Sequence, residues 1–307
     1  MKYEIKIDKP VEGNGHIDFR RLAQLADVIS KVAEGALQLR LRGVSITAGR
    51  KQAKLDDALR IDLVGVKKGS TRLMVESRTL GDTLTGIQFD AFRHEEQLKL
   101  KEQTPMSLFM NTFHDALDEQ GNKEFLDKPL LNQLKSFKKV FRAKEETFHV
   151  SNEGHTKTLT VQHESIKRIA ELEDSLPEPE RIVLKGTVDL LQHSSSRIRI
   201  KGPDGTMEGF LSDDLDRTAV AQFWTKETTV VGMVHFKPGG RRTIEVQQLY
   251  RADKAEDYFA KPQKGETSEH QIERQLREKG GRNTAKTVVG QWPGEEDFND
   301  LLEQLTA

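Results

Sequence analysis

The chain has 307 residues, no cysteine and a formal net charge of -1, with 48 Lys and Arg residues against 49 Asp and Glu residues. The lack of cysteine excludes disulfides, thiolate metal sites and a cysteine nucleophile, and the balanced charge shows no overall basic excess of the kind that favours nucleic-acid binding. The start of the chain lacks the apolar segment of a signal peptide, and no apolar run approaches the ~18 residues of a membrane span. We therefore expect a cytoplasmic protein that does not enter a membrane.

Residues 1–175 are predicted to form an α+β domain. Apolar and charged residues alternate over 3–7, which is typical of a strand. A long apolar pattern at helical spacing follows Asp18, a good N-cap, and stops at Gly43. Alternation on both sides of a Lys-Lys-Gly-Ser turn predicts a hairpin over 59–75. The expected unit is a strand, a helix and a hairpin, with the helix packed on an antiparallel sheet.

A helical block is predicted over roughly 84–143, followed by a hairpin over 146–162 with its turn at 152–154 and a short helix over 165–174. Pro105 suits the first position of a helix, and apolar residues recur at helical spacing after it. The Leu-Pro-Glu-Pro-Glu stretch at 176–180 then breaks the chain. The helical block therefore belongs with the N-terminal domain.

Residues 176–252 are predicted to form a small β-barrel domain. The segment contains short strands, one of them with a central Gly186, turns at 203–205 and 238–240, and a helical insert at 214–224. Closure into a barrel removes the edges of such a small sheet. We therefore expect an OB-like or SH3-like barrel after the α+β domain.

Two groups of basic residues are candidates for contact with nucleic acid. A turn of the N-terminal hairpin could contact a phosphate, and the barrel could form the strand-tracking groove that OB folds use. The alternative is an ordinary solvated turn and a purely structural barrel with a basic rim, because residues 181–252 hold only 11 basic against 8 acidic residues. The candidates are Lys67, Lys68 and Arg72 in the turn, and Arg197, Arg199, Lys237, Arg241 and Arg242 in the barrel.

Metal-binding and catalytic motifs are not recognisable in the sequence. His114 and Asp118 have helical spacing, but no third ligand accompanies them, and the histidines at 149, 155 and 163 match no metal motif. The nucleophile, zinc-protease and kinase signatures are also missing. We therefore expect a non-enzymatic protein without catalytic residues, metal or cofactor.

The last part of the chain combines a polar linker, 253–286, with an amphipathic tail, 287–307. Three acids follow Gly294 in the first turn of a predicted helix, and apolar residues then recur at i, i+3, i+4 and i+7. So short a helix is marginal alone in water and needs a surface. We predict that it docks on a partner protein, or on its own body, through Trp292, Pro293, Glu295, Glu296, Phe298, Leu301, Leu302 and Leu305.

The sequence WPGEEDFNDLLEQL, from Trp292 to Leu305, resembles the C-terminal tails of bacterial antitoxins encoded beside PIN-type ribonuclease toxins. This resemblance implies that the tail binds a partner protein, which in that setting is a nuclease toxin. The leading hypothesis is a non-enzymatic bacterial protein, antitoxin-like or a phage-defence accessory, that docks a partner through its tail. The alternative hypothesis is a nucleic-acid-binding protein that uses the barrel and the 67–72 turn.

Overall fold

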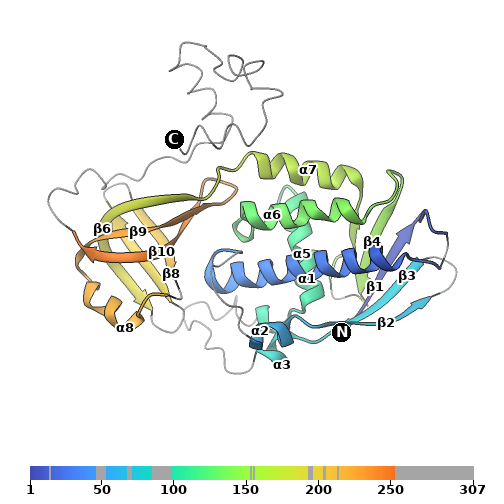
Figure 1. The fold of residues 1–307 in the computed structure, drawn as a ribbon, viewed down its shortest axis with the longest axis horizontal. Helices are drawn as coiled ribbons and strands as arrows, with labels where there is room; N and C mark the ends of the chain where they lie inside the picture. The colour runs from blue at the N-terminus through green and yellow to red at the C-terminus, as the bar shows by residue number, and fades with distance from the viewer. Residues whose placement is uncertain are drawn as a thin grey trace, which may run out of the picture. The chain divides into compact units, whose positions relative to one another are not determined.

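A computed structural model describes residues 1–252 apart from 14, 46–52, 68–70, 85–98, 153, 155, 193–195, 203–204 and 213. These residues belong to one compact unit, Met1–Gly265. The unit contains a five-stranded sheet with helices and a closed five-stranded barrel (Figure 1). The α+β class and the barrel predicted from the sequence are confirmed. The predicted linker and docking helix lie outside the described residues.

The N-terminal sheet is antiparallel, with the strand order β2-β3-β1-β4-β5. Alternation along β1 places Tyr3, Ile5 and Ile7 on the buried face, each 1% exposed, and turns the charged residues to the other face. The predicted first strand and both predicted hairpins are thereby confirmed. The strands are β1 (Lys2–Asp8), β2 (Ile61–Lys67), β3 (Thr71–Ser77), β4 (Thr147–Asn152) and β5 (Leu159–Val161).

Helix α1 (Phe19–Arg42) begins and ends where the sequence predicts. The Asp18 carboxylate accepts a hydrogen bond from the Arg21 backbone N–H at 3.0 Å, which caps the first turn. Gly43 ends the helix with a φ of 85°, a left-handed conformation that favours glycine. Both boundaries follow from local chemistry alone.

One hydrophobic core joins the buried face of the sheet to the helices, which lie beside it in Figure 1. Within the described residues, the block predicted over 84–143 contains the helices α5 (Pro105–Leu117) and α6 (Lys128–Lys135), two short 3-10 helices and a further helical segment at 99–102. Among the described helices, none is long and apolar enough to cross a membrane. Besides α1, the helices are α2 (Ala53–Ala58), α3 (Leu80–Thr83), α5 (Pro105–Leu117), η2 (Lys123–Phe125), α6 (Lys128–Lys135), η3 (Ser136–Val140) and α7 (His163–Asp174).

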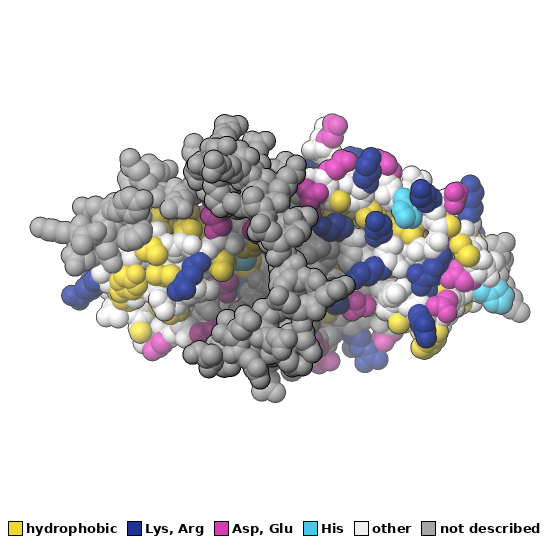
Figure 2. All heavy atoms as spheres, turned by 45° about the horizontal axis from the view of Figure 1, so that its top comes forward, with side chains coloured by type: hydrophobic (Ala, Val, Ile, Leu, Met, Phe, Trp, Pro, Cys, Tyr) yellow, Lys and Arg dark blue, Asp and Glu magenta, His cyan; other side chains and the backbone are white. Residues whose placement is uncertain are grey.

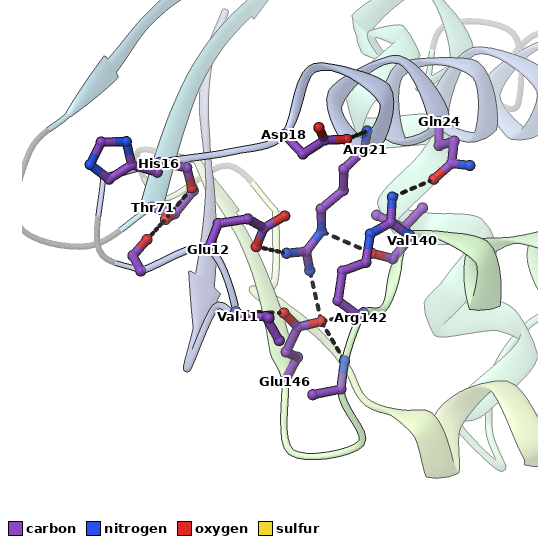
Figure 3. Close-up of polar contacts among 12 residues, drawn as sticks. Val11, Glu12, His16, Asp18, Arg21, Gln24, Thr71, Val140, Arg142 and Glu146 are labelled. Atoms are coloured by element: carbon purple, nitrogen blue, oxygen red, sulfur yellow. Dashed lines mark hydrogen bonds and ion pairs between the residues drawn. The ribbon is translucent and has the colours of Figure 1, made fainter.

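A fully buried arginine ties the segment after β1, helix α1 and the turn before β4 together (Figure 3). The guanidinium of Arg21 donates to Glu12 Oε2 at 2.5 Å, to Glu146 Oε2 at 2.7 Å and to the Val140 carbonyl oxygen at 2.9 Å. Glu146 also accepts the backbone N–H of Arg142 at 2.7 Å. A buried charge is tolerated only when it is paired and hydrogen-bonded in this way. The cluster therefore links three segments that are far apart in the chain: the one after β1, helix α1 and the turn before β4.

The barrel closes in the strand order β10-β8-β7-β6-β9 and has a hydrophobic core of its own. β8 and β10 pair in parallel, whereas the other pairs are antiparallel. The helical insert predicted between the strands is present as α8 (Arg217–Val220) and η4 (Ala221–Phe223). The strands are β6 (Glu180–Gln192), β7 (Arg197–Gly202), β8 (Gly205–Leu211), β9 (Glu227–Phe236) and β10 (Arg242–Arg251).

Candidate nucleic-acid interface

Strand β7 directs its basic side chains to the outside of the barrel. Ile198 and Ile200 are 1% and 0% exposed in the barrel core. Since side chains alternate along a strand, Arg197, Arg199 and Lys201 point outward between them. In the Arg-Ile-Arg-Ile-Lys sequence of this strand, the two isoleucines therefore contribute to the barrel core and the three basic residues form its outer face.

The barrel wall of a cleft of about 960 Å³ is formed by β6, β7, β8, the turn that joins β9 to β10, and the start of β10. The structure thereby brings together five of the eight basic candidates, which lie up to 45 positions apart in the chain. The barrel wall of the cleft contains a single carboxylate, that of Glu208, among the described residues. Its five basic side chains are those of Arg197, Arg199, Lys237, Arg241 and Arg242.

The remaining lining residues come from the C-terminal end of α1 and from η2, and they add two further cations, Arg40 and Arg42. Burial lowers the pKa of Arg40 to about 10, although the charge of Asp115, 3.7 Å away, acts in the opposite direction. Arg40 therefore keeps its charge at neutral pH. Sequence reasoning missed both arginines because basic residues in the last turn of a helix are expected from the helix dipole alone.

Part of this positive charge is already paired within the protein. Arg199 Nη2 lies 3.3 Å from Glu208 Oε1, and Arg199 Nη1 lies 3.8 Å from Asp189 Oδ2. All three side chains are more than one third exposed, so these pairs are weak and can exchange with a ligand. Arg241 pairs with Glu124 of η2. The complete lining still contains seven basic side chains and two carboxylates, which makes the cleft electropositive.

The aromatic residues of the barrel divide between its interior and its surface. Phe210, Phe223 and Phe236 are 3%, 9% and 9% exposed, whereas Trp224 and Tyr250 are 58% and 40% exposed. Neither exposed aromatic lines the cleft. Among the described lining residues the aromatic side chain is that of Phe125 on η2, which stacks on Arg40 of α1. The cleft therefore suits contacts to a sugar-phosphate backbone better than base stacking.

The basic turn of the N-terminal hairpin is separate from this cleft and partly neutralised. Lys67 and Arg72 face each other across β2 and β3. Lys67 Nζ and Arg72 Nη1 lie 3.9 Å and 3.4 Å from the carboxylate oxygens of Glu4 on β1. Lys68 lies outside the described residues.

On the face around α1, α6 and α7 in Figure 2, basic and acidic side chains are interspersed, so no large field of one sign stands out there.

His114 and His149, candidates for metal ligands from the sequence, make polar contacts within the protein. His149 lies 3.0 Å from an Asp8 oxygen and shares a hydrogen bond with a threonine of β5, and His114 contacts the carbonyl oxygen of Lys157. Over the described ranges, no three His, Asp or Glu side chains are grouped as metal ligands. The tail residues from Trp292 to Leu305, on which the antitoxin resemblance depends, lie outside the described residues.

Comparison of the chain with protein-family models, with curated proteins and with solved structures found no significant match.

Proposed function

We propose that this protein binds single-stranded nucleic acid in the barrel cleft and holds the sugar-phosphate backbone with basic side chains. The observation that carries the proposal is the ratio of five basic residues to one carboxylate on the barrel wall of the cleft. A nucleic-acid backbone carries one negative charge per nucleotide, so a groove of this kind attracts it regardless of sequence. The balanced charge of the whole chain does not oppose this, because the cleft is a local concentration of one sign.

The topology of the barrel supports this location for the site. β6, β7 and β8 form a meander, a helical insert follows, and β10 closes the barrel by parallel pairing with β8. We infer from this strand order an OB-like barrel rather than an SH3-like one. In OB folds the second and third strands, with the loops beside them, bind oligonucleotides and oligosaccharides. The second and third strands here are β7 and β8, which line the cleft.

Fluorescence anisotropy with a labelled single-stranded oligonucleotide, repeated over a series of salt concentrations, tests the proposal. If three to five phosphates contact the cleft, the slope of log K against log salt is expected to be roughly -2 to -3.5. The Arg199→Gln and Arg241→Gln variants should each bind more weakly at every salt concentration and should reduce the slope by about 0.7.

Arg181→Gln provides the matched control, because Arg181 is exposed on β6 and does not line the cleft. This variant should bind as tightly as the wild type. No binding at low salt, or equal losses in the Arg181 and Arg199 variants, would rule out the cleft as a nucleic-acid site.

We also propose, from the sequence pattern of residues 287–307, that the tail docks a partner protein. The tail has one apolar stripe and an acidic first turn, so a partner groove that is apolar with a basic rim would suit it. The resemblance to antitoxin tails favours a nuclease toxin as the partner. In this proposal the protein is a non-enzymatic, antitoxin-like or phage-defence accessory protein, and the nucleic-acid cleft is its second binding site.

A pull-down with the full chain and with a chain that ends before residue 287 tests the tail. Recovery of the partner by both proteins in equal amounts would rule out docking by the tail. Replacement of Trp292, Leu301 and Leu305 by Ala distinguishes a partner from the protein's own body as the docking surface. The melting temperature should stay unchanged if the tail binds a partner, and should fall if it packs on its own chain.

A further inference from the structure

We propose that this protein forms a homodimer in which strand β2 pairs antiparallel with β2 of a second copy. In the part of the chain that the structure describes, β2 is the edge of the N-terminal sheet and pairs with β3 on one side. An edge strand leaves backbone N–H and C=O groups on its other side available to a further strand. This inference does not depend on the barrel cleft, since β2 belongs to a different sheet.

The free edge carries exposed apolar side chains. Leu63, Val64 and Val66 are 48%, 59% and 45% exposed. Leu63 lies opposite Val75 and Val66 lies opposite Leu73, and these partners on β3 are 7% and 1% exposed. The apolar face of the sheet thus continues from β3 into β2. This face is buried on β3 but exposed to solvent on β2. An exposed apolar edge strand is the typical site of strand addition.

The charges of β2 select a second copy as the occupant, because the strand is complementary to itself. When two antiparallel β2 strands meet at a two-fold axis between Val64 and Gly65, Asp62 lies opposite Lys67 of the second copy, and Lys67 opposite its Asp62. Opposite charges that face each other across an antiparallel pair stabilise it. Within one chain, Asp62 contacts Arg60 and Lys67 approaches a glutamate of β1, and these pairs involve exposed side chains that can exchange.

The apolar residues of β2 fit the same register. Leu63 then lies opposite Val66 of the second copy, and Val64 lies opposite Gly65, where a missing side chain leaves room. No atom comes within 4 Å of a Cβ built on Gly65, so the space beside it is open. The register of β2 on β3 shifts between Leu63 and Gly65, so that Leu63 and Val66 lie on one face of the sheet and Asp62 and Lys67 on the other. Each of these two proposed pairs therefore joins residues on the same face. The interface is isologous, as a two-fold dimer requires.

Analytical ultracentrifugation of the full chain over a range of concentrations, without nucleic acid, tests the dimer. The wild type should show a reversible monomer–dimer equilibrium. Asp62→Lys and Lys67→Asp each set like charges opposite each other at two symmetry-related positions, and should weaken dimerisation by about tenfold. The Asp62→Lys/Lys67→Asp double variant restores opposite charges across the axis and should regain the wild-type association.

Asp27→Lys is the matched control, because Asp27 forms an exposed ion pair with Lys31 on α1 and the substitution changes the net charge by the same amount as Asp62→Lys. It should leave dimerisation unchanged, and circular dichroism should show that all variants fold. A wild type that stays monomeric at every concentration overturns the proposal. A dimer that the single substitutions leave intact, or that the double variant fails to restore, overturns it as well.

Discussion

From the buried cluster around Arg21 we expect a large loss of stability for Glu146→Gln. Glu146 is 1% exposed, and its carboxylate faces only donors: the guanidinium of Arg21 and the backbone N–H groups of Val11, Arg142 and Ala143. A glutamine at this position has the same shape, but it has no charge and presents an NH2 group to one of these donors. The substitution therefore leaves Arg21 short of one of its two carboxylates.

The magnitude follows from the geometry of the pair. Removal of one partner from a buried ion pair costs about 3–5 kcal/mol. The lower end applies here, because Glu12 Oε2 lies 2.5 Å from the same guanidinium and still compensates its charge. We expect the free energy of unfolding to fall by about 3 kcal/mol, which lowers the melting temperature by roughly 6–12 °C in a protein of this size.

Urea unfolding, followed by far-ultraviolet circular dichroism, measures this loss. The control is Glu145→Gln, the same substitution at the exposed neighbouring position, which should change the free energy of unfolding by less than about 0.5 kcal/mol. A loss of less than about 1 kcal/mol for Glu146→Gln would refute the reasoning, because the pair would then contribute no more than an exposed one.

Three further predictions concern the pH dependence, the barrel and a buried hydrogen bond. Burial by itself raises the pKa of Glu146, but hydrogen bonds from backbone amides and the charge of Arg21 outweigh burial and hold the pKa below its usual 4.5. The carboxylate therefore stabilises the fold above that pH, and the stability is lost as the pH falls through the lowered value. Unfolding curves between neutral and acidic pH should show this loss in the wild type and less of it in Glu146→Gln. Gly209→Ala would place a Cβ 2.2 Å from a carbonyl oxygen of β10 and should destabilise the barrel by about 1–3 kcal/mol in urea unfolding, whereas Gly65→Ala meets no atom within 4 Å and should be tolerated. Tyr3→Phe removes a 2.7 Å buried hydrogen bond to the Thr104 hydroxyl and should cost about 0.5–1.5 kcal/mol in the same assay, and an unchanged stability would contradict this expectation.

Much of the fold could be predicted because its signals are local. The cap at Asp18, the left-handed Gly43 and the apolar spacing between them define α1 without reference to the rest of the chain. The alternation of apolar and polar residues likewise marks the strands of both sheets. The burial of Arg21 could not be predicted in this way. A charged residue just after a helix cap is expected to be exposed, yet Arg21 is fully buried. Its carboxylate partner Glu146 is 125 positions further along the chain.

The sequence by itself determined the element types, the α+β class, the presence of a small barrel and the basic character of its strands. Each of these depends on residues within a few positions of one another, where backbone geometry sets the period. Only the tertiary structure decided which basic residues act together, because strand pairing and barrel closure bring Arg197 and Arg199 of β7 to the same cleft as Lys237, Arg241 and Arg242. Pairing across a sheet is a long-range contact, and its register cannot be read from either strand alone.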